Sequence, residues 1–143
     1  MSSFDVIGKE ITRRDAYDKV TGRAEYVADL NLPGMVYGKM IHSPVAHAIF
    51  KSIDTSKALA LPGVVDITTF EDIPEIPYTS CGHPRPYDTP ADLFIYNRHA
   101  RYVGDPIGCV VAETPEIAEE AVRLLTYEYE ELPFYLTPDE AMA

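Results

Sequence analysis

The C-terminal third of the chain decides the fold, and it reads Ile107-Gly-Cys-Val-Val-Ala112, then Thr114-Pro-Glu-Ile-Ala-Glu-Glu-Ala-Val-Arg-Leu-Leu125, then Thr126-Tyr-Glu-Tyr-Glu-Glu131. The first stretch is non-polar throughout, as in a strand covered on both faces. The second opens with a capping threonine and a proline that loses nothing at the first helical position, and its apolar residues recur at helical spacing. The third alternates tyrosine with glutamate, which is typical of a half-buried strand. Together they predict a β-α-β unit.

Shorter elements precede this unit, because 12 prolines divide the sequence. Apolar alternation and β-branched residues predict strands over 35–42, 48–54 and 64–69. Cap-type residues followed by helix formers predict a short helix over 54–60. One helical turn, ended by its proline, is expected over 70–74.

Two turns and one long loop complete the pattern. Thr21-Gly22 suits a turn that leads Ala24–Asp29 into a strand, with the glycine free to take a positive φ. Gly104-Asp105-Pro106 suits a turn that fixes the entry to the apolar strand at Ile107. Residues 74–92 show no period and are interpreted as one irregular loop, of a length that often carries function or faces a partner.

The last residues suggest a helix that is cut short. Thr137-Pro138-Asp139-Glu140 repeats the helix-start chemistry, but the sequence stops at Ala143. A helix of this length is not stable by itself. We therefore expect the natural protein to continue beyond this point.

Composition excludes several classes of partner. The 143 residues include 23 acidic and 12 basic side chains, a formal charge of −11. This balance argues against a nucleic-acid backbone or an anionic membrane as the main partner, because both require clustered lysine and arginine. No apolar run approaches the ~20 residues of a membrane span. Because Met1–Asp5 lacks the basic and apolar regions of an export signal, we expect a cytoplasmic location.

Cysteines and two of the histidines have simple structural explanations. Cys81 and Cys109 form neither a disulfide framework nor a zinc knuckle, so Cys81 is interpreted as a loop thiol and Cys109 as a small buried residue. His42 and His47 are five positions apart across a Ser-Pro break, which does not match a helical zinc pair. We interpret both as hydrogen-bonded structural or surface residues.

The remaining reactive side chains reveal no site either. The sequence shows no partner for His83 or His99, and Glu128, Glu130 and Glu131 fit the solvated face of a strand. No Gly-rich phosphate loop or Gly-x-Ser-x-Gly elbow occurs in the sequence. We therefore predict no catalytic, cofactor-binding or metal-binding residue in this chain.

Lys39 leaves one alternative open. Gly38-Lys39-Met40 has the lysine beside a methionine that biotinyl and lipoyl carrier domains present on a β-turn. A stand-alone carrier or ligand-binding module, with Lys39 as its modification site, is therefore a second hypothesis. The strand pattern continues through Lys39, which favours an exposed strand lysine.

A series of short motifs resembles one known family along nearly the whole chain, from about residue 8 to 141. The motifs are Asp15–Leu30, Gly34–Gly38, Ser43-Pro-Val-Ala-His-Ala48, Leu61-Pro-Gly-Val64, Glu71-Asp-Ile-Pro74, Arg101-Tyr-Val-Gly-Asp-Pro106, Glu116–Ala121, Tyr127–Glu130 and Leu132-Pro133. They occur in family order and resemble the α/β hammerhead domain of the molybdenum hydroxylases. This family includes the xanthine dehydrogenase, aldehyde oxidase and carbon monoxide dehydrogenase large subunits.

The resemblance implies an α+β hammerhead fold with a mixed sheet, and residues 1–143 as a single domain at the N-terminus of a larger molybdenum-binding subunit. It also implies a complete oxidoreductase that hydroxylates a purine or aldehyde carbon with oxygen from water at a molybdopterin centre. [2Fe–2S] clusters, FAD and often NAD would carry the electrons away. The expected partners are the downstream molybdenum-binding domain and the iron–sulfur and flavin subunits or domains.

The family's functional motifs have no counterpart here. Its pterin-binding Gly-rich and Gln motifs and its catalytic glutamate belong to the portion that follows the hammerhead domain. Two cysteines cannot supply a four-cysteine iron–sulfur site. We therefore transfer no site residue to this sequence and expect the segment alone to be inactive, while the choice of substrate within the family stays open.

Overall fold

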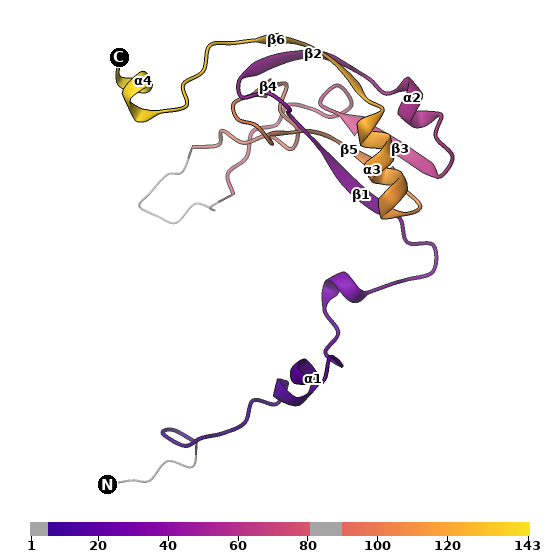
Figure 1. Ribbon diagram of the computed structural model, residues 1–143, viewed down its shortest axis with the longest axis vertical. Coiled ribbons are helices and arrows are strands. Elements are labelled where there is room, and N and C mark those ends of the chain that lie inside the picture. Colours follow the sequence, from indigo (N-terminus) through magenta and orange to yellow (C-terminus); the bar gives the residue numbers. More distant parts are fainter. Residues whose placement is uncertain (1–5, 81–89) are drawn as a thin grey trace. The chain divides into compact units, whose positions relative to one another are not determined.

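The computed structural model describes residues 6–80 and 90–143 (Figure 1). Contacts within the chain divide it into two compact units, Met1–Met35 and Val36–Ala143. The larger unit contains the strands and the hydrophobic core.

Six strands of the larger unit form two antiparallel three-stranded sheets. The first sheet has the order β1-β5-β3, with bounds Tyr37–His42, Pro106–Ala112 and Val64–Thr69. The second has the order β4-β2-β6, with bounds His99–Ala100, Ala48–Asp54 and Thr126–Glu131. The strands expected over 35–42, 48–54 and 64–69 are thus confirmed, as are the two in the C-terminal third.

The α+β class is confirmed, but the strands form two sheets instead of the single mixed sheet that was expected. Both long edges of β5 are occupied, by β1 and by β3, so the strand that follows the helix has no free edge there. It pairs with β2 instead, and the helix therefore connects two sheets. All strand pairs among the described residues are antiparallel, whereas a mixed sheet was expected.

Helix α3, Pro115–Arg123, forms as the sequence predicts. The Thr114 hydroxyl accepts a hydrogen bond from the Ile117 amide at 3.3 Å, and Pro115 occupies the first turn. The helix packs against β1, β5 and β3, where Figure 1 shows it as the orange coil. The short helix α2, Ser56–Leu59, also contacts it. Ala118 and Ala121 are buried, and their small side chains allow the helix to pack close to the sheet.

The hydrophobic core lies between the two sheets and helix α3, and strand β5 runs through its centre. Its largest members are Ile41, Phe50, Ile53, Ile67, Phe70, Ile107, Val110 and Leu125. Gly108 is required on β5 because a Cβ atom there would lie 2.6 Å from the Thr68 carbonyl oxygen. The neighbouring strand can therefore approach only a glycine at this position.

Two short expected elements take other forms. Residues 70–74 form a turn, because the Asp72 carboxylate accepts from the backbone amide of Thr69 at 2.7 Å and from its hydroxyl at 3.0 Å. The strand expected over Ala24–Asp29 is a 3-10 turn, η1, at Val27–Asp29. Asp29 there accepts the Tyr26 amide at 2.9 Å, and the described sheets do not include this segment.

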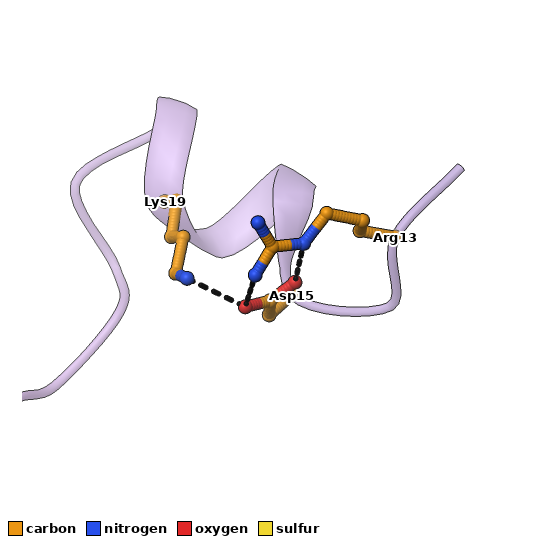
Figure 2. A network of polar contacts seen from close by, with 3 residues as sticks. All are labelled: Arg13, Asp15 and Lys19. Carbon is orange, nitrogen blue, oxygen red and sulfur yellow. Dashed lines mark hydrogen bonds and ion pairs between the residues drawn. The ribbon is translucent and has the colours of Figure 1, made fainter.

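Within the smaller unit, the structure has local order without a core. Helix α1, Ala16–Val20, ends at a turn in which Gly22 has a φ of 71°, as expected for Thr21-Gly22. Figure 2 shows Asp15 between Arg13 and Lys19, with oxygen–nitrogen distances of 2.9 and 2.7 Å. Hydrogen bonds first from Lys19 and then from Arg13 lower the pKa of Asp15. All three side chains are exposed, so these pairs contribute little to stability.

The chain ends in helix α4, Pro138–Met142, which the Thr137–Glu140 motif predicts. The Thr137 hydroxyl and the Glu140 carboxylate form a capping box, and hydrogen bonds from the Leu136 and Thr137 amides lower the pKa of Glu140. No residue of this helix is buried. None of the described helices is long and apolar enough to cross a bilayer.

Candidate functional site

The reactive side chains singled out from sequence are dispersed in the structure. Cys81 and His83 lie outside the described residues. Cys109 is half-buried on β5, and burial raises the pKa of its thiol, which disfavours the reactive thiolate. Lys39 lies within β1 opposite Val110, so it is a strand lysine, as favoured above, and not the turn lysine of a carrier domain.

His47 and His99 form the most specific polar contact that the structure reveals. Their Nε2 atoms are 2.8 Å apart, and the His47 Nδ1 atom lies 2.6 Å from the Pro133 carbonyl oxygen. The ring planes are within 22° of parallel, with centroids 5.0 Å apart. Because the two nitrogens are much closer than the centroids, the rings meet edge to edge through a hydrogen bond.

The Pro133 carbonyl determines which ring nitrogens of the two histidines carry protons. A carbonyl only accepts, so His47 Nδ1 carries a proton and donates to Pro133. With both rings neutral, His47 Nε2 must then accept from His99 Nε2–H. Burial, followed by the nearby charge of Arg101, lowers the pKa of His99 and favours its neutral form. The pair joins the start of β2 to β4 and to the segment after β6.

The histidine predictions are thus partly confirmed and partly corrected. His47 is hydrogen-bonded and His42 is exposed, as expected. His99 does have a partner, although the sequence shows none, because 52 positions separate the two residues. Glu128, Glu130 and Glu131 are all exposed to solvent, as expected, but Glu131 lies on the opposite face of β6 from Glu128 and Glu130.

Asp105 organises the turn beside the histidine pair. It is almost fully buried, and its two oxygens accept from Asn97 Nδ2 at 2.7 Å and from the Arg101 amide at 2.9 Å. The backbone of buried Ser43 accepts from Gly104 and donates to the Asp105 carbonyl. Gly104 has a φ of 98°, as the predicted turn requires. The sequence motif gives the turn, but not the buried acceptor role of Asp105.

A basic hollow opens next to this turn. It has a volume of about 180 Å³ and is lined by Ile49, Glu75, Phe94, Tyr96, Asn97, Arg98, His99 and Arg101. The long loop expected over 74–92 contributes Glu75, and in its described part Tyr78 pairs with Leu93 through a single bridge. The hollow provides guanidinium donors over an apolar floor, which suits recognition of an anionic group more than bond-breaking chemistry.

The described residues offer no ligand set for a metal ion or for an iron–sulfur cluster held by four cysteines. Across 6–80 and 90–143, no three His, Cys, Asp or Glu side chains converge as metal ligands. A [2Fe–2S] cluster held by four thiolates requires four cysteines, and the sequence has two. No catalytic step is therefore assigned to this chain.

Comparison with known proteins agrees with this fold. The family profile of the aldehyde oxidase and xanthine dehydrogenase a/b hammerhead domain matches residues 21–133. The chain is 44% identical over 135 residues to the xanthine dehydrogenase molybdenum-binding subunit of Escherichia coli O157:H7, covering 92% of this chain and 18% of that protein. The xanthine dehydrogenase of Dictyostelium discoideum is 40% identical over 137 residues, which cover 96% of this chain and 10% of that protein.

Solved structures of related enzymes share the fold over nearly the whole chain. The aldehyde oxidoreductase of Desulfovibrio desulfuricans superposes with a TM-score of 0.83 at 30% identity, covering 95% of this chain and 16% of that one. Quinoline 2-oxidoreductase of Pseudomonas putida 86 gives a TM-score of 0.78 at 36% identity, with coverages of 94% and 17%. The chain thus spans less than a fifth of the length of these relatives. It belongs to the aldehyde oxidase and xanthine dehydrogenase family, as an α/β hammerhead domain.

Proposed function

We propose that residues 1–143 act as one hammerhead module of a larger molybdenum-binding subunit. The module has no catalytic, cofactor-binding or metal-binding residue, and it packs against the molybdenum-binding remainder and the iron–sulfur and flavin subunits or domains. The complete enzyme hydroxylates a purine or an aldehyde carbon with water-derived oxygen, using molybdopterin, [2Fe–2S] clusters and FAD. Support comes from the relatives, which include a xanthine dehydrogenase molybdenum-binding subunit and an aldehyde oxidoreductase.

One observation carries the packing role: the smaller unit exposes its apolar side chains and buries none of its described residues. The exposed set is Val6, Ile7, Ile11, Tyr17, Val20, Tyr26, Val27, Leu30 and Leu32. The segment after β6 repeats the pattern with Phe134, Tyr135, Leu136 and Met142. Exposed apolar surface of this extent marks an interaction site, because contact between apolar side chains and water is energetically unfavourable.

Hydrogen exchange tests the proposal. We would measure amide exchange in the isolated chain and in a chimera in which it replaces the matching 135 residues of the Escherichia coli relative. Amides of residues 6–35 should exchange at least about tenfold more slowly in the chimera, because a partner surface shields them, while amides of β5 change little. Unchanged exchange over 6–35 would contradict the packing role.

Activity provides a second test. The isolated chain should show no turnover of xanthine or of an aldehyde with an artificial electron acceptor, because it lacks the cofactor ligands. Turnover above background by this chain alone would overturn the assignment. The cytoplasmic location is part of the same proposal, and fractionation of cells that express the full subunit tests it.

A further inference from the structure

The basic hollow beside β4 concentrates unpaired positive charge in an acidic protein. Acidic side chains outnumber basic ones by 23 to 12, yet the ion pairs found over 6–80 and 90–143 leave Arg98 and Arg101 without a carboxylate partner. Both arginines line the hollow. Two unpaired arginines in one concavity favour an anion as its occupant.

Arg98 is held in place from both its backbone and its side chain. Its carbonyl accepts from the Phe50 amide at 2.9 Å, which ties it to the core strand β2. Its guanidinium carbon lies 4.9 Å from the ring centroid of buried Phe70. A guanidinium that rests on an aromatic face keeps its N–H groups free at the edge, where they can donate to an oxygen anion.

Arg101 is fixed by the turn next to it. Its amide donates to buried Asp105 at 2.9 Å, and its Nη1 atom donates to the His99 carbonyl at 3.3 Å. One of five guanidinium N–H groups is thereby used, and the others are available. Because both arginine side chains are already held by these contacts, they lose little conformational freedom when an anion binds in the hollow. The entropic cost of binding is therefore lower.

The size of the hollow limits the ligand to a small group. Its volume is about 180 Å³, whereas pockets for drug-sized ligands hold roughly 300–1,000 Å³. Ile49, Phe94 and Tyr96 give it apolar walls. A carboxylate on a short aliphatic stem matches both the walls and the arginines.

We propose that this hollow receives one aspartate or glutamate side chain from the molybdenum-binding remainder of the subunit, so that Arg98 and Arg101 lock the module to its partner. This inference rests on the proposed function, which supplies the partner. Glu75 also lines the hollow, where its negative charge opposes the binding of an anion, although it forms no ion pair with either arginine.

Titration with blocked amino acids tests the binding chemistry on the 143-residue chain. N-acetyl-glutamate methylamide is added while backbone amide shifts are followed by NMR, and N-acetyl-glutamine methylamide is the neutral control of equal shape. We expect saturable shifts around residues 96–101 with the glutamate probe alone. Arg98→Gln and Arg101→Gln should each weaken binding about tenfold, whereas Glu75→Gln should strengthen it about threefold.

Arg123→Gln is the matched control, because Arg123 already pairs with Glu119 at 3.2 Å on the exposed face of α3. It should leave the titration unchanged. Equal responses to both probes, no response, or binding that survives both pocket substitutions would each overturn the inference.

The chimera separates this inference from the proposed function. In it, the double variant Arg98→Gln/Arg101→Gln should speed amide exchange over 96–101 at least about tenfold, and Arg123→Gln should not. If residues 6–35 are protected and the double variant changes nothing, the packing role stands and the lock is wrong. If residues 6–35 stay unprotected, the packing role itself fails, whatever the probe titration shows.

Discussion

Replacing Asp105 should destabilise the larger unit more than its number of hydrogen bonds suggests. Asp105 is only 3% exposed, and Asp105→Ala leaves two donors without an acceptor, Asn97 Nδ2 and the Arg101 amide. Asn97 is itself only 9% exposed, so its side-chain donor is poorly placed to find bulk water, whereas Arg101 lies at the surface. The cost is set by these stranded donors and not by the bonds themselves.

The expected loss of stability follows from the number of donors that lose their acceptor. Each buried donor without a partner costs about 1–3 kcal/mol, so the pair gives about 2–6 kcal/mol. Asn97, Arg101 and Asp105 also border a second hollow of about 640 Å³, distinct from the basic hollow, through which water can enter the vacated space and recover part of this loss. We therefore expect the free energy of unfolding to fall by about 3 kcal/mol, and by about half of that for Asp105→Asn, which keeps one acceptor.

Asp72 offers a matched control. Its carboxylate also accepts two hydrogen bonds, from the amide and the hydroxyl of Thr69, but it is exposed. Asp72→Ala should cost about 1 kcal/mol or less, because water replaces the lost acceptor. Urea denaturation followed by circular dichroism measures both variants. Equal losses for the two alanine variants would refute the reasoning that burial sets the cost.

Three further perturbations test other parts of the fold. Gly108→Ala should lower the free energy of unfolding by about 1–3 kcal/mol in the same urea assay, because the added methyl group meets the β3 backbone. Gly38→Ala is the control: its added atom lies 3.4 Å from the Cys109 thiol, so this substitution should be neutral or slightly stabilising. Burial lowers the pKa of His99 below 6.5, so the folded state binds its proton less well and the free energy of unfolding falls as pH drops below that value. His99→Gln should reduce this slope between pH 7 and 5, and a slope equal to that of the unsubstituted chain would contradict the assignment. Thr114→Ala should cost about 1 kcal/mol, because the first turn of α3 loses its cap; an unchanged urea midpoint would argue against that.

Elements set by local chemistry could be predicted from the sequence. The cap, proline and apolar stripe of α3 act within one helix, and the structure places that helix at Pro115–Arg123 as expected. The apolar run that becomes β5 buries Gly108, Val110 and Ala112 on one face, whereas Cys109 and Val111 on the other face are only half-buried, so the expected cover on both faces is partly confirmed. The turns at Gly22 and Gly104 need a positive φ, which the residue type itself reveals.

Features that depend on which strands become neighbours could not be predicted in the same way. A β-α-β order is compatible with one sheet or with two, and the choice depends on whether a strand edge is still free. The edges of β5 are occupied by β1 and β3, which come from distant parts of the sequence. The pairing of His47 with His99 has the same origin, because it requires β2 and β4 to lie side by side first.

The smaller unit shows a different limit, because its apolar residues have no core within it to enter. Val20 and Val27 are 83% and 86% exposed, although composition alone would assign such residues to an interior. The missing strand over Ala24–Asp29 has the same cause, since a strand needs a neighbouring edge to satisfy its backbone groups. If a partner surface supplies both the edge and the apolar cover, this unit gains its remaining structure on docking, at the entropic cost that accompanies such ordering. Its sequence is then matched to the partner, and the hammerhead core alone does not explain it.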